Sequence, residues 1–129
     1  MPYFISQESD QGFSIDPEVF VRKLRAHWPG AIVRATAEPY RKYLYEWTLQ
    51  TKVGELDGRL AKQHGAVALE GSLSSAAAFA VWFQREIAGC DRNLRFYDEN
   101  YDPVVNLKDE TSEDEIISRM VRGVAFGAG

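Results

Sequence analysis

The clearest metal-binding spacing in this chain lies between residues 98 and 109. Asp98, Asn100 and Asp102 form a D-x-N-x-D series, and Asp109 stands at the twelfth position of such a calcium loop. Pro103, however, occupies the sixth position, where the loop needs a glycine for its sharp turn. The spacing therefore predicts an acidic turn between two strands and no metal site.

Nucleophilic and zinc chemistry require cysteine, histidine or serine in a suitable context. The chain has one cysteine, Cys90, and two histidines, His27 and His64, without the spacing of zinc ligands. Cys90 follows the C-terminus of a predicted helix, where the helix dipole disfavours a thiolate. The serines within 72–75 lack a G-x-S-x-G elbow, and helix capping accounts for them. The sequence therefore predicts no catalytic residue and no cofactor, and it favours a protein that is not an enzyme.

Composition and charge restrict the partners. The 129 residues are 45% hydrophobic, which suits one compact α+β domain over 1–129. The formal net charge is −4, and the segment from Asp98 to Glu115 holds eight acids and one lysine. Such a surface repels phosphates, so nucleic acid is not an expected partner. Without an apolar run of about 20 residues we expect no membrane span, and the single cysteine is typical of a cytoplasmic protein.

The strongest helix prediction covers Gly71 to Gly89. Hydroxyl residues suited to capping begin it, and the glycine at its end is suited to a C-terminal stop. Its middle turns are apolar nearly all round, and Val81 and Trp82 fall outside the main apolar stripe. These two side chains are either covered by another element or form a surface on which a partner binds.

Two further helices have clear starting signals. Asp16 and Pro17 begin one that ends at Pro29-Gly30, and the series Ser112 to Glu115 is a capping box for the last. Gly123 is expected to end that last helix.

Short segments with strand patterns occupy much of the remaining chain, and the tight turns between several of them favour antiparallel pairing. The segment at Tyr3–Ile5 is a candidate to pair with 12–15. We predict an α+β fold in two layers: an antiparallel sheet of about five to six short strands with three helices on one face. The strand candidates are Tyr3–Ile5, Ala31–Ala35, Arg41–Thr51, Leu56–Leu60, Ala66–Glu70, Leu94–Tyr97 and Val104–Leu107.

The period-two pattern of 41–51 places aromatic side chains on one side of a strand. Tyr43, Tyr45, Trp47 and Leu49 point one way, and the other side carries Leu44, Glu46, Thr48 and Gln50. The aromatic side is either the core face of the sheet or, if it is open, an aromatic binding platform.

The residues of Ala76 to Asp102 also carry a resemblance. The series Ala-Ala-Ala-Phe-Ala-Val-Trp-Phe and Leu-Arg-Phe-Tyr-Asp-Glu-Asn-Tyr resembles small single-domain bacterial proteins, some of which look like immunity proteins encoded beside secreted toxins. The resemblance implies a cytoplasmic, non-catalytic α+β protein that binds a cognate toxin, and it carries over no catalytic residue.

Charge and the lack of site chemistry together predict a protein-binding domain, in the sharpest version an immunity protein that neutralises a basic toxin domain. Two alternatives stay open. One is a small-molecule-binding protein or minor enzyme with a pocket between sheet and helices, lined by the tyrosines and His64, and the other is a homodimer through Val81 and Trp82. The predicted contact residues are Asp98, Glu99, Tyr101, Asp102 and Trp82.

Overall fold

The computed structural model describes residues 2–7, 16–35, 43–61, 66–88, 94–100, 103–108 and 110–128. These residues form an α+β fold with one seven-stranded antiparallel sheet, in the strand order β2-β3-β4-β5-β1-β6-β7. The fold class is as predicted, and the sheet has seven strands where about five to six were expected. The elements are β1 (Pro2–Gln7), α1 (Pro17–His27), β2 (Ile32–Ala35), β3 (Tyr43–Thr51), β4 (Gly54–Ala61), β5 (Val67–Gly71), α2 (Leu73–Phe83), β6 (Leu94–Asp98), β7 (Val104–Leu107) and α3 (Glu113–Ala128).

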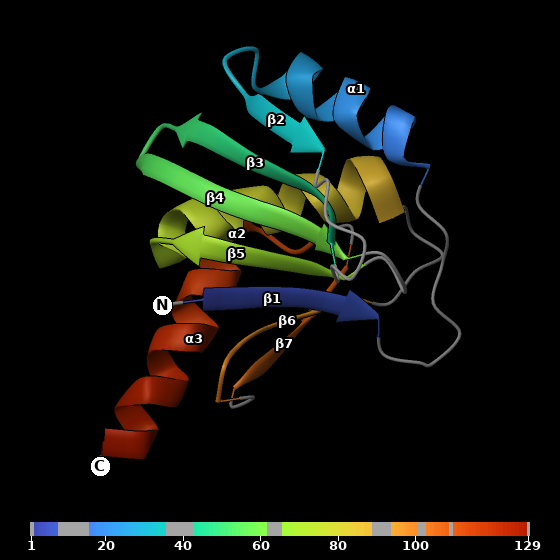
Figure 1. Ribbon diagram of the computed structural model, residues 1–129. Helices are drawn as coiled ribbons and strands as arrows, with labels where there is room; N and C mark the ends of the chain where they lie inside the picture. Colours follow the sequence, from blue (N-terminus) through green and yellow to red (C-terminus); the bar gives the residue numbers. More distant parts are fainter. Residues whose placement is uncertain are drawn as a thin grey trace.

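The helices cover one face of the sheet, and the core lies between the two layers. Figure 1 shows α2 running behind β4 and β5. Alternate residues of the strands, such as Ile5, Leu60 and Phe96, are fully buried against the helices, while their sequence neighbours face the other way. Two layers with one shared core are the arrangement that period-two strands and amphipathic helices predict. None of the described helices is both long and apolar enough to cross a lipid bilayer.

Strand β1 lies inside the sheet although it begins the chain. Tyr3 is opposite Leu69 of β5 on one side and Asp98 of β6 on the other. The predicted partner, 12–15, lies outside the described residues, and both edges of β1 are already paired with β5 and β6. The expected local hairpin is therefore wrong. The sheet instead gains long-range pairing on both sides of this strand.

Helix α1 begins and ends where its sequence signals place it. The Asp16 carboxylate accepts hydrogen bonds from the backbone N–H groups of Glu18 and Val19, at 3.0 and 3.4 Å. These bonds satisfy donors that the first helical turn leaves open. Phe20 and Leu24, one turn apart, are fully buried against the layer below.

Helix α2 is buried on more than one side, which explains why it has apolar residues around nearly its whole circumference. Ser72 caps it by accepting the N–H of Ser75 at 3.1 Å. Ala76 and Ala80 are fully buried, and their small side chains allow close packing. After Phe83 the helix widens into a π-helical segment, Gln84–Ala88.

Two local predictions need correction. Helix α3 continues past Gly123 to Ala128, because glycine inside a helix costs only about 1 kcal/mol and does not break it. In β3 the register shifts between Tyr43 and Tyr45, so that Tyr43 pairs with Ala61 and Tyr45 with Leu60. The strict period of two assumed for the aromatic row therefore holds only from Tyr45 onward.

Candidate functional site

From Tyr45 to Leu49 the aromatic row of β3 faces the core, with Trp47 and Leu49 buried and Tyr45 half-buried against them. Trp47 and Leu49 are 1% and 0% exposed. The Trp47 ring stacks on Phe79 of α2 with 5.5 Å between centroids and lies 5.1 Å from Phe20 of α1. These contacts pack the Trp47 ring between the sheet and the helices. His64 and Cys90 lie outside the described residues.

Trp82, one of the predicted contact residues, is covered by α1. Its side chain is 6% exposed. The indole lies 5.1 Å from the Trp28 ring and 6.0 Å from the His27 ring, both at the end of α1. Neighbouring Val81 is half-buried. A partner or a second copy of the chain would therefore meet α1 before it met Trp82.

Asp98, a second predicted contact residue, is also covered: it is 4% exposed. Its Oδ1 accepts the backbone N–H of Asn100 at 2.9 Å, so the carboxylate closes the turn after β6. Glu99 is exposed, whereas Tyr101 and Asp102 lie outside the described residues. Within the described part of the chain, no group of three or more acidic, cysteine or histidine side chains has the arrangement to hold a metal ion.

The described acids of the segment from Asp98 to Glu115 lie at both ends of the β6–β7 hairpin. In the β6–β7 hairpin, Tyr97 pairs with Val104 near one end and Leu94 with Leu107 at the other. Glu99 and the described acids that follow β7 therefore lie beyond opposite ends of the paired part of the hairpin, which is roughly 13 Å long at about 3.3 Å per strand residue. A partner that bound the whole segment would have to contact both ends of the hairpin.

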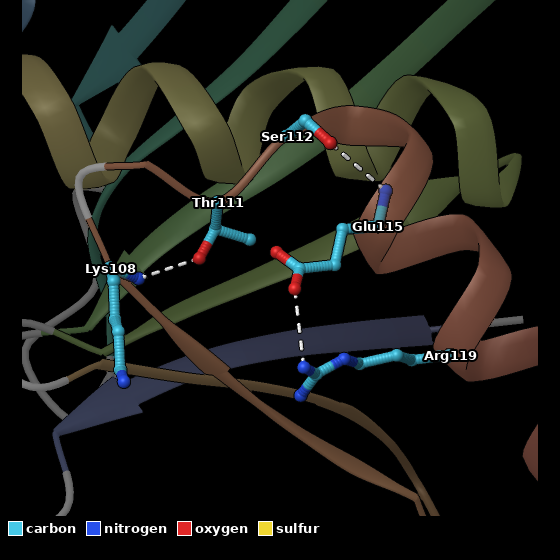
Figure 2. Close-up of polar contacts among 5 residues, drawn as sticks. All are labelled: Lys108, Thr111, Ser112, Glu115 and Arg119. Carbon is cyan, nitrogen blue, oxygen red and sulfur yellow. Dashed lines mark hydrogen bonds and ion pairs between the residues drawn. The ribbon is translucent and has the colours of Figure 1, made fainter.

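The second group of acids lies at the start of α3, where Figure 2 shows the contacts of Ser112 and Glu115. Ser112 Oγ accepts the N–H of Glu115 at 3.1 Å, which confirms the predicted cap. The Glu115 carboxylate does not return to the cap, as a full capping box requires, but binds Arg119 at 3.1 Å. Glu110, Glu113 and Asp114 are exposed around this turn.

Three hydroxyl groups near the start of α2 also have a structural role. Ser75 is fully buried, and its Oγ lies 3.0 Å from both Ser72 Oγ and Thr51 Oγ1. Thr51 in turn donates to the carbonyl of Gly54 at 2.7 Å. The hydroxyls therefore connect the helix cap to the β3–β4 turn.

The face of the sheet opposite the helices presents charged, polar and aromatic side chains. No helix covers it in the described part of the chain, as the uncovered strands in Figure 1 show. The strand registers align one residue of each strand in a row: Arg34, Glu46, Arg59, Ala68, Phe4, Tyr97 and Val104. The next row contains Ile32, Thr48, Asp57, Glu70 and Pro2. We call the surface formed by these two rows the open face.

A hollow of about 460 Å³ occupies the middle of the open face. Ala68 lines it and stands between the longer side chains of Arg59 and Phe4 in the first row. This difference in length creates the depression. Asp57 and Glu70 of the second row also line it. The hollow thus has an apolar part on the side of β1 and a charged part on the side of β4 and β5.

The charges around the hollow are arranged unequally between the rows. In the first row Arg59 Nε lies 3.7 Å from Glu46 Oε1. In the second row Asp57 of β4 and Glu70 of β5 are directly opposite each other. Asp57 Oδ1 accepts a hydrogen bond from Thr48 Oγ1 at 2.7 Å.

Sequence reasoning did not select the residues of the open face. The alternation of Leu56 and Leu60 with Asp57 and Arg59 is visible in the sequence and indicates a polar side of β4. The residues of other strands that lie on the same face are determined by strand order and register, and these cannot be predicted from a local sequence pattern. Phe4 in particular joins the surface only because β1 enters the sheet between β5 and β6.

Comparisons with known protein families, curated proteins and solved structures find no match to this chain.

Proposed function

We propose that this protein is a non-catalytic protein-binding domain and that the open face is its binding surface. The observation that supports the proposal is a sheet whose second face is not covered by any of the described helices and presents charged and aromatic side chains. Seven strands about 4.8 Å apart make a face roughly 30 Å wide, which is the scale of a standard protein interface.

The charges of this face suit a protein partner better than a nucleic acid. Three carboxylates in the two rows, those of Glu46, Asp57 and Glu70, outnumber the guanidinium groups of Arg34 and Arg59. A surface that binds a phosphate backbone needs an excess of cations. Interspersed charges of both signs instead favour a partner with a complementary pattern, because such patterns exclude wrong partners and set orientation.

The sharper form of the proposal is an immunity protein that binds and inhibits a basic toxin domain. The exposed acids Glu110, Glu113 and Asp114 at the start of α3 support it, since they would attract a basic partner from a distance. They would act on the rate of association, and the open face on the lifetime of the complex.

The test is affinity capture of the products of neighbouring genes with the purified protein, followed by titration of any captured protein. Asp57→Lys on the open face is expected to weaken binding of a basic partner tenfold or more, because it reverses a negative charge inside the contact. Glu86→Lys makes the same change on the exposed helix side and is the matched control. Equal affinities of the two variants would refute the open face as the binding surface, and the absence of any captured protein would contradict the function.

A further inference from the structure

We propose that Arg95 is the cationic residue of a binding site for a carboxylate group, next to the open face on strands β1, β6 and β7. Ser6 of β1 and Asn106 of β7 are directly opposite Arg95, one on each side of it. Leu94 and Phe96 are fully buried on the helix side of β6, so Arg95 between them lies on the other face. We call Ser6, Arg95 and Asn106 the arginine site. This inference goes beyond the proposed function, because the site would bind a free carboxylate as well as one on a partner.

The guanidinium group of Arg95 has few acceptors for its donors. Its Nη2 donates to the backbone carbonyl of Gln7 at 3.4 Å, which is longer than the usual range of about 2.7–3.2 Å. Its Nε is buried and has no hydrogen-bond partner. A guanidinium group has several N–H donors and no acceptor, and a half-buried cation is stabilised by a group that uses them. A carboxylate can accept two parallel N–H groups, here from the terminal nitrogens, because Nε is covered.

The negative charges of the sheet do not neutralise Arg95. Within the described part of the chain, no carboxylate lies within ion-pair distance of it. Asp98 lies on the helix side of β6 and is buried. Glu70 is opposite Pro2, four residues along β1 from Ser6. That separation is about 13 Å at about 3.3 Å per strand residue, which exceeds the Debye length of about 8 Å at physiological ionic strength.

The neutral side chains beside Arg95 suit a group with a single charge. Asn106 is exposed on the edge strand β7, and its amide makes no hydrogen bond with the described residues. It can therefore donate to a carboxylate oxygen. Ser6 Oγ lies 3.0 Å from the Tyr97 hydroxyl, which holds it beside Arg95. One cation balances one carboxylate, whereas a phosphate carries more negative charge and calls for further cations.

The probe is acetate, titrated into the ¹⁵N-labelled protein at constant ionic strength and followed by NMR. We expect saturable shifts at the backbone amides of Ser6, Arg95 and Asn106. Acetamide has nearly the same shape without the charge, and it should bind at least fivefold more weakly. Equal binding of acetate and acetamide, saturation only at other residues, or no saturable shift would overturn the inference. Tighter binding of inorganic phosphate than of acetate would overturn the assignment to a carboxylate.

A peptide distinguishes the two sources of the carboxylate. Acetyl-Gly-Glu-Gly-amide presents the group as a side chain of a protein, and the same peptide with glutamine is its uncharged control. Binding of the glutamate peptide at least as tight as that of acetate would assign the site to an acidic residue of a partner protein. Weaker binding of the peptide would assign it to a small free acid. Both outcomes support a carboxylate site, provided that the glutamine peptide binds more weakly than the glutamate peptide.

Variants then test Arg95 itself. Arg95→Gln should weaken acetate about fivefold, which is the scale of a partly exposed charge pair. Arg95→Lys keeps the charge without the planar pair of donors and should recover part of the loss. Arg22→Gln, on the exposed side of α1, is the matched control and should leave binding unchanged. The acetamide comparison uses the unaltered protein, so it decides the question even if a variant does not fold.

The arginine site and the proposed function can fail separately. Capture of a partner that depends on Asp57, combined with no binding of acetate or the glutamate peptide, would refute the arginine site and leave the proposed function standing. Saturable binding of acetate that depends on Arg95, without any captured protein, would support the site and contradict the proposed function.

Discussion

Gly58 of β4 is the residue on which the packing of Trp47 most directly depends. The two residues are directly opposite each other in the β3–β4 pair. A Cβ atom at position 58 would lie 2.3 Å from Trp47 Cε2 and 2.4 Å from Nε1. Ordinary carbon contacts are about 3.5–4.0 Å, so Gly58→Ala would require the indole to move by more than about 1 Å. The Trp47 ring is 1% exposed and packed against Phe20 and Phe79, so it has no free space to enter.

The expected loss of stability follows from two opposing effects. Overpacking a core costs about 1–3 kcal/mol. Replacing glycine by alanine restores about 0.4–1 kcal/mol, because the unfolded chain loses freedom. The net destabilisation of Gly58→Ala is therefore about 1–2 kcal/mol. With a urea m-value of about 2 kcal/mol/M, the midpoint of unfolding should fall by roughly 0.5–1 M.

Urea unfolding followed by circular dichroism measures this effect, and a double-mutant cycle with Trp47→Phe assigns its cause. In the Trp47→Phe background the clash is relieved, so Gly58→Ala should cost at least about 1 kcal/mol less than in the original chain. Gly30→Ala is the control, because a Cβ there meets no atom within 4 Å. The reasoning fails if Gly58→Ala is as neutral as Gly30→Ala, or if its cost is the same in both backgrounds.

Two further predictions concern buried polar groups. Ser75→Ala removes the hydroxyl shared by Ser72 and Thr51 and should destabilise the protein by about 1–2 kcal/mol in urea; the explanation is wrong if the stability is unchanged. Burial, reinforced by the negative charge of Asp98, raises the pKa of Tyr3 above its usual 10.0. Folding thus favours the protonated phenol, so stability is fully present below pH 10 and falls as the pH rises through the higher folded-state pKa. Unfolding measured from pH 8 to 11 should show a smaller alkaline loss for Tyr3→Phe, and identical slopes would contradict this assignment.

Much of the fold could be predicted because its signals are local. Asp16 and Ser112 mark helix starts by capping chemistry that involves residues two to three positions away. Trp47 and Leu49 alternate with polar residues, as a strand covered on one face requires. The fold class then followed from short turns between such strands.

The errors in the fold arose where distant residues compete with local ones. The segment at Tyr3–Ile5 was expected to pair with its nearest neighbour in sequence, but β5 and β6 occupy both its edges. Gly123 was expected to end α3, whereas the helix continues to Ala128. A glycine is a common helix terminator, but its small cost does not oblige the helix to stop.

The candidate site was less accessible to sequence reasoning than the fold. Charge density selected Asp98 and Glu99, which are adjacent in sequence, yet one is buried and the other exposed. Trp82 was predicted to be a contact residue because it is apolar and lies outside the main apolar stripe of α2, but α1 covers it. Whether a side chain is exposed depends on the residues that pack against it, and a count of charged or apolar residues in the sequence does not identify them.

The sequence by itself determined the class of the fold, the helix caps and the side of each strand that is apolar, because capping and alternation act over a few residues. Only the tertiary structure decided that β1 lies between β5 and β6, that α1 covers Trp82, and that Asp57 and Glu70 face each other beside Phe4. The physical reason is that strand order and register join residues far apart in the chain, and the open face exists only through those pairings.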